Sequence, residues 1–157
     1  MKEKLKEYLD LYLNIDNYMV EDRCERALFS KMSVGSSISN YIDTNKEDSF
    51  NKVLFKYIDE SGLSDSEVYN KVNIDRRLFS KIRGENYHPS KETVILLGIA
   101  LELDEENIER LLKSASYSLP KNTVYDLIIR FCFKEKIYDV NKVNGFLYDY
   151  KCKLLSE

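Results

Sequence analysis

The fold of this chain is decided at residues 62–90, which read GLSDSEVYNKVNIDRRLFSKIRGENYHPS. The stretch contains the start signals of two short helices. Ser64 and Glu67 have the spacing of a capping box, in which a serine and a glutamate three residues later satisfy free N–H groups at a helix start. Asp75 is a typical N-cap residue for the second helix. The sequence therefore predicts one short helix after Ser64 and another after Asp75.

The link between these two helices suits a tight turn. The first helix is predicted to run to about Lys71, and the second, DRRLFSKIR, stops at Gly84. Asn73 lies between them, and asparagine tolerates the left-handed backbone conformation that a tight turn demands. A helix, a short turn and a second helix make up the helix-turn-helix unit.

This stretch resembles the phage-repressor-like helix-turn-helix family, of the XRE type. The resemblance is carried by Ser64, Glu67, Asn73, Ile74, Asp75, Phe79, Ile82, Pro89 and Ser90. It covers about residues 49–116. The same stretch is also similar to a recurrent bacterial subfamily of unassigned role. The resemblance implies an all-α fold, with a five-helix repressor-like domain in which helix 75–83 is the recognition helix.

The other helices of this domain have start and stop signals of their own. Ser49 can cap the first helix, and Gly62 can end it. Pro89 with Ser90 opens the fourth helix, and Asp104 caps the fifth. The predicted core of the domain consists of Val68, Val72, Ile74, Phe79, Ile82, Leu97, Leu101 and Leu111.

Residues 1–47 are predicted to be an N-terminal helical segment that ends in a linker. Apolar residues at helical spacing mark the ranges 2–14 and 20–32 as amphipathic helices. The stretch SVGSS at 33–37 is expected to break the second of these helices. The polar stretch DTNKEDS at 43–49 is then a linker into the domain at 48–116.

Residues 117–157 are predicted to be a C-terminal helical extension. Helix 122–137 has Val124, Leu127, Ile128 and Phe131 on one face, and Ile129 and Phe133 on another. A helix that is apolar on two sides is buried on two sides. We therefore expect it to pack on the middle domain and, at the same time, on a further helix or a second chain. A last helical pattern covers residues 139–155.

Composition places the chain among soluble globular proteins. Of its 157 residues 43% are hydrophobic and 32% charged, and only 2 are proline and 5 glycine, which leaves room for long helices. Three scattered cysteines suit a reducing cytosol. The N-terminus has no apolar core of a signal peptide, and the longest near-apolar run, 94–103, is far shorter than a membrane span of about 20 residues. We expect a cytoplasmic protein of bacterial type that makes no contact with a membrane.

The charge of the chain is concentrated in a way that favours nucleic-acid binding. The net charge is −3, so no global basic field exists. Residues 75–83 nevertheless carry +3, whereas the whole domain at 48–116 carries −3. Arg76 and Arg77 fall in the first helical turn, where the helix dipole opposes cations by about 0.3–1 kcal/mol each. A phosphate or a guanine edge would explain their placement.

The sequence therefore predicts a sequence-specific DNA-binding transcription regulator that reads the major groove of double-stranded DNA with helix 75–83. The predicted DNA-binding residues are Arg76, Arg77, Ser80, Lys81, Arg83, Asn86 and Lys91. A homodimer is expected, since the family commonly reads two half-sites, and its contact would come from residues 1–32 or 122–155. Asp65 argues against DNA binding, because the family usually has a polar phosphate-binding residue there.

The alternative is a protein–protein adaptor that uses the same fold without binding DNA. Its docking surface would include Tyr69, which replaces a small residue between the two helices, and Leu78, which falls where the family faces the groove. An enzyme is not expected: the single histidine, His88, lies beside Pro89 in a polar loop, far in sequence from every cysteine. No cofactor or metal site is predicted either, because a glycine-rich phosphate loop and a set of metal ligands are both missing.

Overall fold

The computed structural model describes residues 34–84 and 86–156 and divides the chain into two units, Met1–Lys46 and Glu47–Glu157. In the first unit, residues 34–45 form a helix. The predicted helices at 2–14 and 20–32 lie outside the described residues.

The helix at 34–45 corrects two sequence-based predictions. The stretch 33–37 does not break the helical pattern, since helix continues from residue 34, and the linker shrinks to residues 46–49. A glycine or serine in a helix costs only about 1 kcal/mol or less and need not end it. Polar side chains also support the end of the helix: the Thr44 hydroxyl donates to the Asn40 carbonyl at 2.7 Å, and the Asn45 amide donates to the Tyr41 carbonyl at 2.8 Å.

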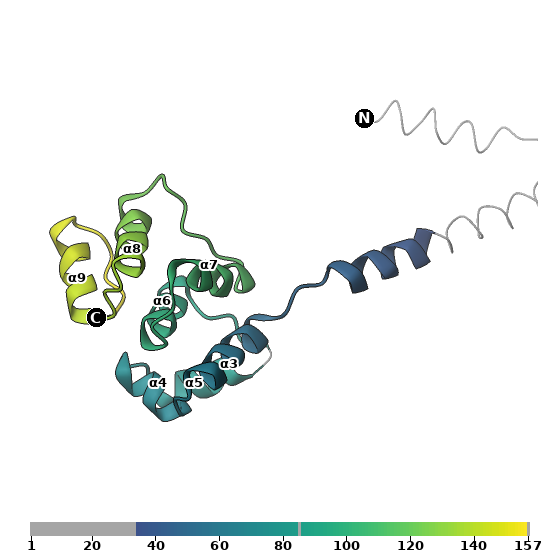
Figure 1. The fold of residues 1–157 in the computed structure, drawn as a ribbon, viewed down its shortest axis with the longest axis horizontal. Coiled ribbons are helices and arrows are strands. Elements are labelled where there is room, and N and C mark those ends of the chain that lie inside the picture. The colour runs from purple at the N-terminus through teal and green to yellow at the C-terminus, as the bar shows by residue number, and fades with distance from the viewer. Residues whose placement is uncertain (1–33, 85, 157) are drawn as a thin grey trace, which may run out of the picture. The chain divides into compact units, whose positions relative to one another are not determined.

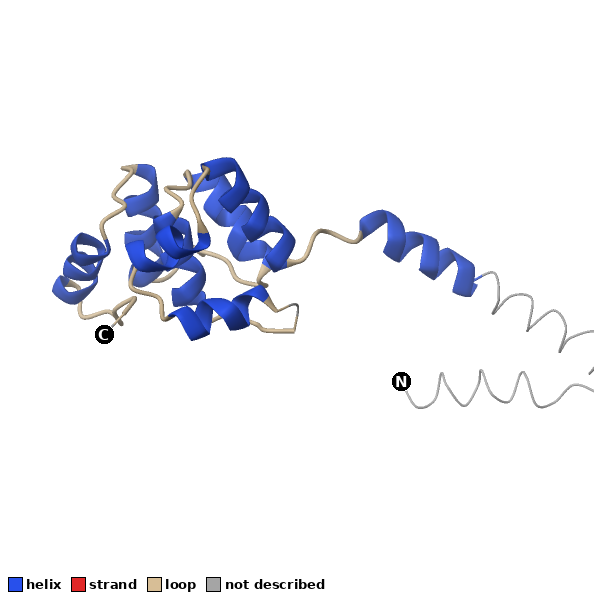
Figure 2. Cartoon of the chain, turned by 90° about the horizontal axis from the view of Figure 1, so that it is seen from below, coloured by secondary structure: helices blue, strands red, loops and turns tan. Residues whose placement is uncertain are grey.

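The second unit is all-α within its described residues, as predicted (Figures 1 and 2). Its helices are α3 (Phe50–Ser61), α4 (Asp65–Lys71), α5 (Arg76–Arg83), α6 (Lys91–Ala100), α7 (Glu105–Ser114), α8 (Val124–Lys134) and α9 (Val140–Asp149). Helices α6 and α7 lie between α3–α5 on one side and α8–α9 on the other (Figure 1). The C-terminal helices thus belong to the same unit as the middle ones.

Local capping signals account for most helix starts. The capping box is present: the Ser64 hydroxyl accepts from the Glu67 N–H, and the Glu67 carboxylate accepts from the Ser64 N–H. Asp75 caps α5, as predicted, and Ser90 and Asp104 cap α6 and α7 in the same way. Ser49 precedes α3, but its side chain makes no capping hydrogen bond.

Five helices end in one repeated arrangement. After α4, α6, α7, α8 and α9 a non-glycine residue takes the left-handed conformation, with φ between 51° and 61°: Asn73, Glu102, Ser116, Lys136 and Lys151. In each case the next N–H donates to the carbonyl five residues earlier, at 2.8–3.1 Å. This is the Schellman motif, in which glycine is the usual left-handed residue. Only Gly62, after α3, provides a left-handed glycine in the part of the chain that the structure describes.

The core runs through the whole second unit. Every residue predicted for it is buried: Val68, Val72, Ile74, Phe79, Ile82, Leu97, Leu101 and Leu111. Gly98 lets α6, α7 and α8 approach closely, because a Cβ atom at this position would lie 2.3 Å from Ile108 Cδ1 and 3.2 Å from Phe133 Cζ. The sequence reasoning missed this role of Gly98.

Helix α8 is buried on one side and not on the other. Ile129 and Phe133 are buried, and α8 packs against α7 and α9. Val124, Leu127 and Phe131 remain about half exposed. The expected packing on the middle domain and on a further helix is confirmed. Burial of both predicted faces is wrong for the single chain, because α9 packs beside α8 without covering this second face.

Candidate nucleic-acid interface

Helix α5 has one buried face and one exposed basic face. Phe79 and Ile82 are buried in the core. Arg76, Arg77, Ser80 and Lys81 are all exposed. Their spacing along the helix places Arg77, Ser80 and Lys81 on the side opposite these two residues and Arg76 at the edge of that side. The predicted recognition helix thus brings four of the predicted DNA-binding residues together.

The two ends of α5 are held by polar contacts. At the N-terminus the Asp75 carboxylate accepts from the N–H groups of Arg77 and Leu78, at 2.7 and 3.3 Å. At the C-terminus the buried Asn51 side chain of α3 donates to the carbonyls of Arg83 and Gly84, at 3.2 and 3.0 Å. Asn51 was missed by the sequence reasoning. The available signal was an amide between Phe50 and Leu54, on the apolar side of its helix.

Three cations of α5 differ from the other cations described between residues 47 and 117. Arg76, Arg77 and Lys81 form no ion pair with any described residue. Every other lysine and arginine described between residues 47 and 117 does form one: Lys52, Lys56, Lys71, Arg83, Lys91, Arg110 and Lys113. Over this range, lysine and arginine side chains that form no ion pair with a described residue are therefore confined to α5.

Arg83 has partners within the unit, although its side chain is 61% exposed. Its guanidinium lies 2.9 Å from the Asp65 carboxylate and 5.3 Å from the centre of the Phe55 ring. The contact also affects how Asp65 would act on DNA. Asp65 is half-buried, and the Arg83 cation lies beside it. Its charge is offset by Arg83, so the repulsion of phosphate expected from Asp65 is reduced.

Lys91 points into a contact with α8. Its Nζ atom lies 2.6 Å from Oδ1 of Asp126, whose side chain is buried. The Thr123 hydroxyl donates to the other oxygen of this carboxylate at 2.6 Å. The lysine charge is thus neutralised within the fold, and Lys91 does not join the exposed cations of α5.

The loop between α5 and α6 is tied to the end of α7. Asn86 is exposed in it. The His88 ring donates through Nε2 to the Ala115 carbonyl at 2.8 Å, since a carbonyl can only accept. The Tyr117 hydroxyl donates to the Pro89 carbonyl at 3.0 Å. These contacts fix the course of the loop, and they give His88 a structural partner.

The residues predicted for partner docking lie partly inside the core. The rings of Tyr69 and Phe79 are 5.5 Å apart and tilted by 52°. Tyr69 and Leu78 are both half-buried and pack against core residues. Tyr69 therefore fills space between α4 and α5 and does not swing out to the surface.

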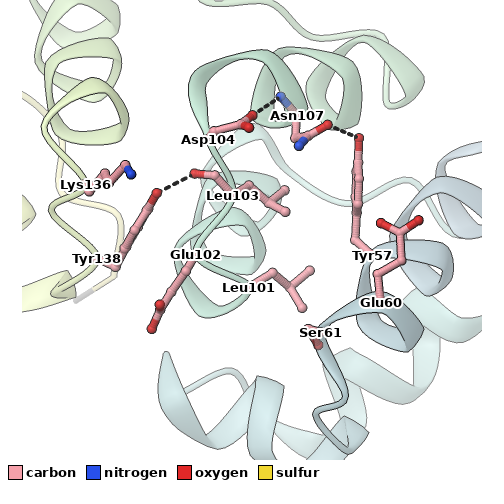
Figure 3. A pocket seen from close by; sticks show the side chains of 10 residues that line it. All are labelled: Tyr57, Glu60, Ser61, Leu101, Glu102, Leu103, Asp104, Asn107, Lys136 and Tyr138. Atoms are coloured by element: carbon pink, nitrogen blue, oxygen red, sulfur yellow. Dashed lines mark hydrogen bonds between the residues drawn. The ribbon is translucent and has the colours of Figure 1, made fainter.

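A hollow of about 480 Å³ lies between the end of α3, the turn from α6 to α7, and the segment after α8 (Figure 3). It is lined by Tyr57, Glu60, Ser61, Leu101, Glu102, Leu103, Asp104, Asn107, Lys136 and Tyr138. Within it the Tyr57 hydroxyl donates to Asn107 Oδ1 at 3.0 Å, and the Tyr138 hydroxyl donates to the Leu103 carbonyl at 2.8 Å. Burial raises the pKa of both tyrosines, so both hydroxyls keep their protons at neutral pH. The hollow was not foreseen from the sequence.

The described residues, 34–84 and 86–156, contain no group of three or more histidine, cysteine, aspartate or glutamate side chains that could hold a metal ion. They also contain no helix with the length and apolar character needed to cross a membrane.

No protein-family model, curated protein or solved structure matches this chain.

Proposed function

We propose that the chain is a sequence-specific regulator of transcription that binds double-stranded DNA and inserts α5 into the major groove. The observation that carries the proposal is the exposed group of Arg76, Arg77 and Lys81, which have no carboxylate partner among the described residues. A polyanion would supply the missing charge.

The energetics of α5 alone favour the same proposal. Arg76 and Arg77 oppose the helix dipole. Arg77 and Lys81 are four residues apart on one helix, where like charges repel by about 0.2–0.5 kcal/mol. Both effects destabilise the free helix and disappear when phosphates lie beside it. The eight residues of α5 span about 12 Å along the helix axis.

The geometry also supports a division of roles. Arg76 and Arg77 are at the N-terminal end of α5, where recognition helices contact base edges. Ser80 and Lys81 follow one turn later and can reach bases or phosphates. Lys91 and Arg83 have partners within the fold, so they contribute less than these four. The adaptor alternative has less support, because Tyr69 and Leu78 are half-buried and pack against the core.

The test compares two double variants of equal charge change. Arg76→Ala with Arg77→Ala should abolish specific binding to DNA fragments selected by the wild-type protein, since each lost arginine–guanine contact costs about 1–3 kcal/mol. The melting temperature should stay the same or rise slightly, because two cations leave a helix N-terminus. Lys52→Ala with Lys56→Ala, on α3, is the matched control and should bind as the wild type does.

The dependence on salt separates phosphate contacts from base contacts. Lys81→Ala should reduce the slope of log K against log salt by about one unit if Lys81 neutralises a phosphate. A wild-type chain that selects no duplex from a random pool at low salt would contradict the proposal. Equal binding by the arginine double variant and the α3 control would contradict it as well.

A further inference from the structure

The helix at 34–45 presents an apolar stripe that lies open to solvent. Val34, Ile38, Tyr41 and Ile42 are each more than half exposed. Their spacing places them on one face of the helix. Every residue described from 34 to 49 is exposed, so no described part of the chain covers this face.

The polar side of this helix indicates what kind of partner the stripe takes. Serine, asparagine and threonine dominate it, and Asp43 is the only charged residue between 34 and 45. Helices that lie on membranes carry lysine and arginine on their polar face, because they meet anionic lipid headgroups. This helix lacks those cations, so a protein surface fits the stripe and a lipid surface does not.

The spacing of the stripe is that of paired helices. Val34, Ile38 and Tyr41 are separated by four and then three residues, which is the interval of the contact positions in a coiled coil. The sequence shows the same interval two heptads earlier, at Val20, Cys24 and Ala27, with Lys31 at the contact position between the two sets. A repeat of seven residues is the pattern of a helix that pairs with another helix of the same repeat. A second copy of the chain supplies such a helix.

We propose that the stripe of Val34, Ile38, Tyr41 and Ile42 is a self-association surface, on which the same helix of a second copy packs. An isolated helix of this length is only marginally stable in water, so pairing would also explain why it forms. The inference does not rest on DNA binding. If both hold, self-association places two copies of α5 in one assembly, as recognition of two half-sites requires.

Sedimentation velocity of the full chain, over a range of protein concentrations, tests the inference. Ile38→Asp should raise the dissociation constant at least about a hundredfold, because each pair of helices loses two buried isoleucines and gains two desolvated carboxylates. Asn40→Asp is the matched control: it adds the same charge on the polar side of the same helix and should associate as the wild type does.

Two further measurements keep the result interpretable. The thermal unfolding of the second unit should be the same in Ile38→Asp and Asn40→Asp, which shows that both variants are folded. Leu127→Asp, on the exposed face of α8, should leave association unchanged. A wild-type chain that is monomeric at high micromolar concentration overturns the inference. So does a dimer that survives Ile38→Asp, or one that is lost in Leu127→Asp.

Discussion

At the scale of single residues, two glycines in helices differ in the space around them. Gly98 lies where α6 meets α7 and α8, and a Cβ atom there would be 2.3 Å from Ile108 Cδ1. Gly145 lies within α9 and has no atom within 4 Å of the position of an added Cβ. Identical substitutions at the two sites therefore have different consequences.

Gly98→Ala should destabilise the protein by about 1–3 kcal/mol, as overpacking of a core does. Gly145→Ala should stabilise it by about 0.5–1 kcal/mol, because alanine forms helix better than glycine and meets no neighbour. Urea unfolding of the two variants beside the wild type measures both effects. Equal shifts of the same sign would show that the close approach at Gly98 is not real.

At the scale of elements, α5 depends on α3 for the position of its C-terminal end. Asn51→Ala leaves the carbonyls of Arg83 and Gly84 without their donor. This should cost about 1–3 kcal/mol in the free energy of unfolding, because two part-buried hydrogen bonds are lost and each is worth about 0.5–1.5 kcal/mol. Asn70→Ala, at an exposed position of α4, is the control and should have almost no effect. Hydrogen exchange of the amides of α5 reports where the stability is lost, and equal protection in both variants would contradict this role of Asn51.

The sequence predicted the elements whose signals are local. The capping box at Ser64, the turn at Asn73 and the cap at Asp75 are each set by residues within one or two turns of the chain. The burial of Phe79 followed from helical phase. The predicted break at 33–37 is wrong, because serine and glycine weaken a helix without having to end it.

The contacts that redistribute charge could not be predicted in this way. Arg83 with Asp65 and Lys91 with Asp126 join residues that are far apart in sequence, and no local pattern marks such pairs. Without these contacts, the sequence predicts all four basic residues of helix 75–83 as DNA-binding residues and does not distinguish between them. The structure separates Arg83 from the other three by giving it a partner.

At the scale of the whole molecule, α8 and α9 stabilise α6 and α7, against which α4 and α3 pack. Asp126 neutralises Lys91, Arg130 pairs with Glu105 at 2.8 Å, and Phe133 packs near Gly98. These contacts link the C-terminal helices to α6 and α7 through buried or half-buried groups. The C-terminal segment is therefore part of the folded unit and not an independent appendage.

A chain that ends at Pro120 tests this dependence. It keeps Tyr117 and the buried Leu119 but lacks α8 and α9, so its melting temperature should fall by well over the 4–8 °C that about 1 kcal/mol produces in a small domain. A chain that begins at Glu47 is the control and should melt as the full chain does, because its core lies between residues 50 and 155. Differential scanning calorimetry measures both, and an unchanged melting temperature at Pro120 would show α8 and α9 to be dispensable.

The repeated helix endings are positions at which the melting temperature of this protein can be raised. Ser116 and Lys151 are exposed, and each adopts a left-handed conformation that disfavours side chains other than that of glycine by about 1–2 kcal/mol. Ser116→Gly and Lys151→Gly should therefore each raise the melting temperature, although glycine gives back part of the gain by loosening the unfolded chain. A lower melting temperature in both would contradict this. An engineer could thus make the molecule more heat-resistant at two positions outside α5, where the basic side chains would stay unchanged.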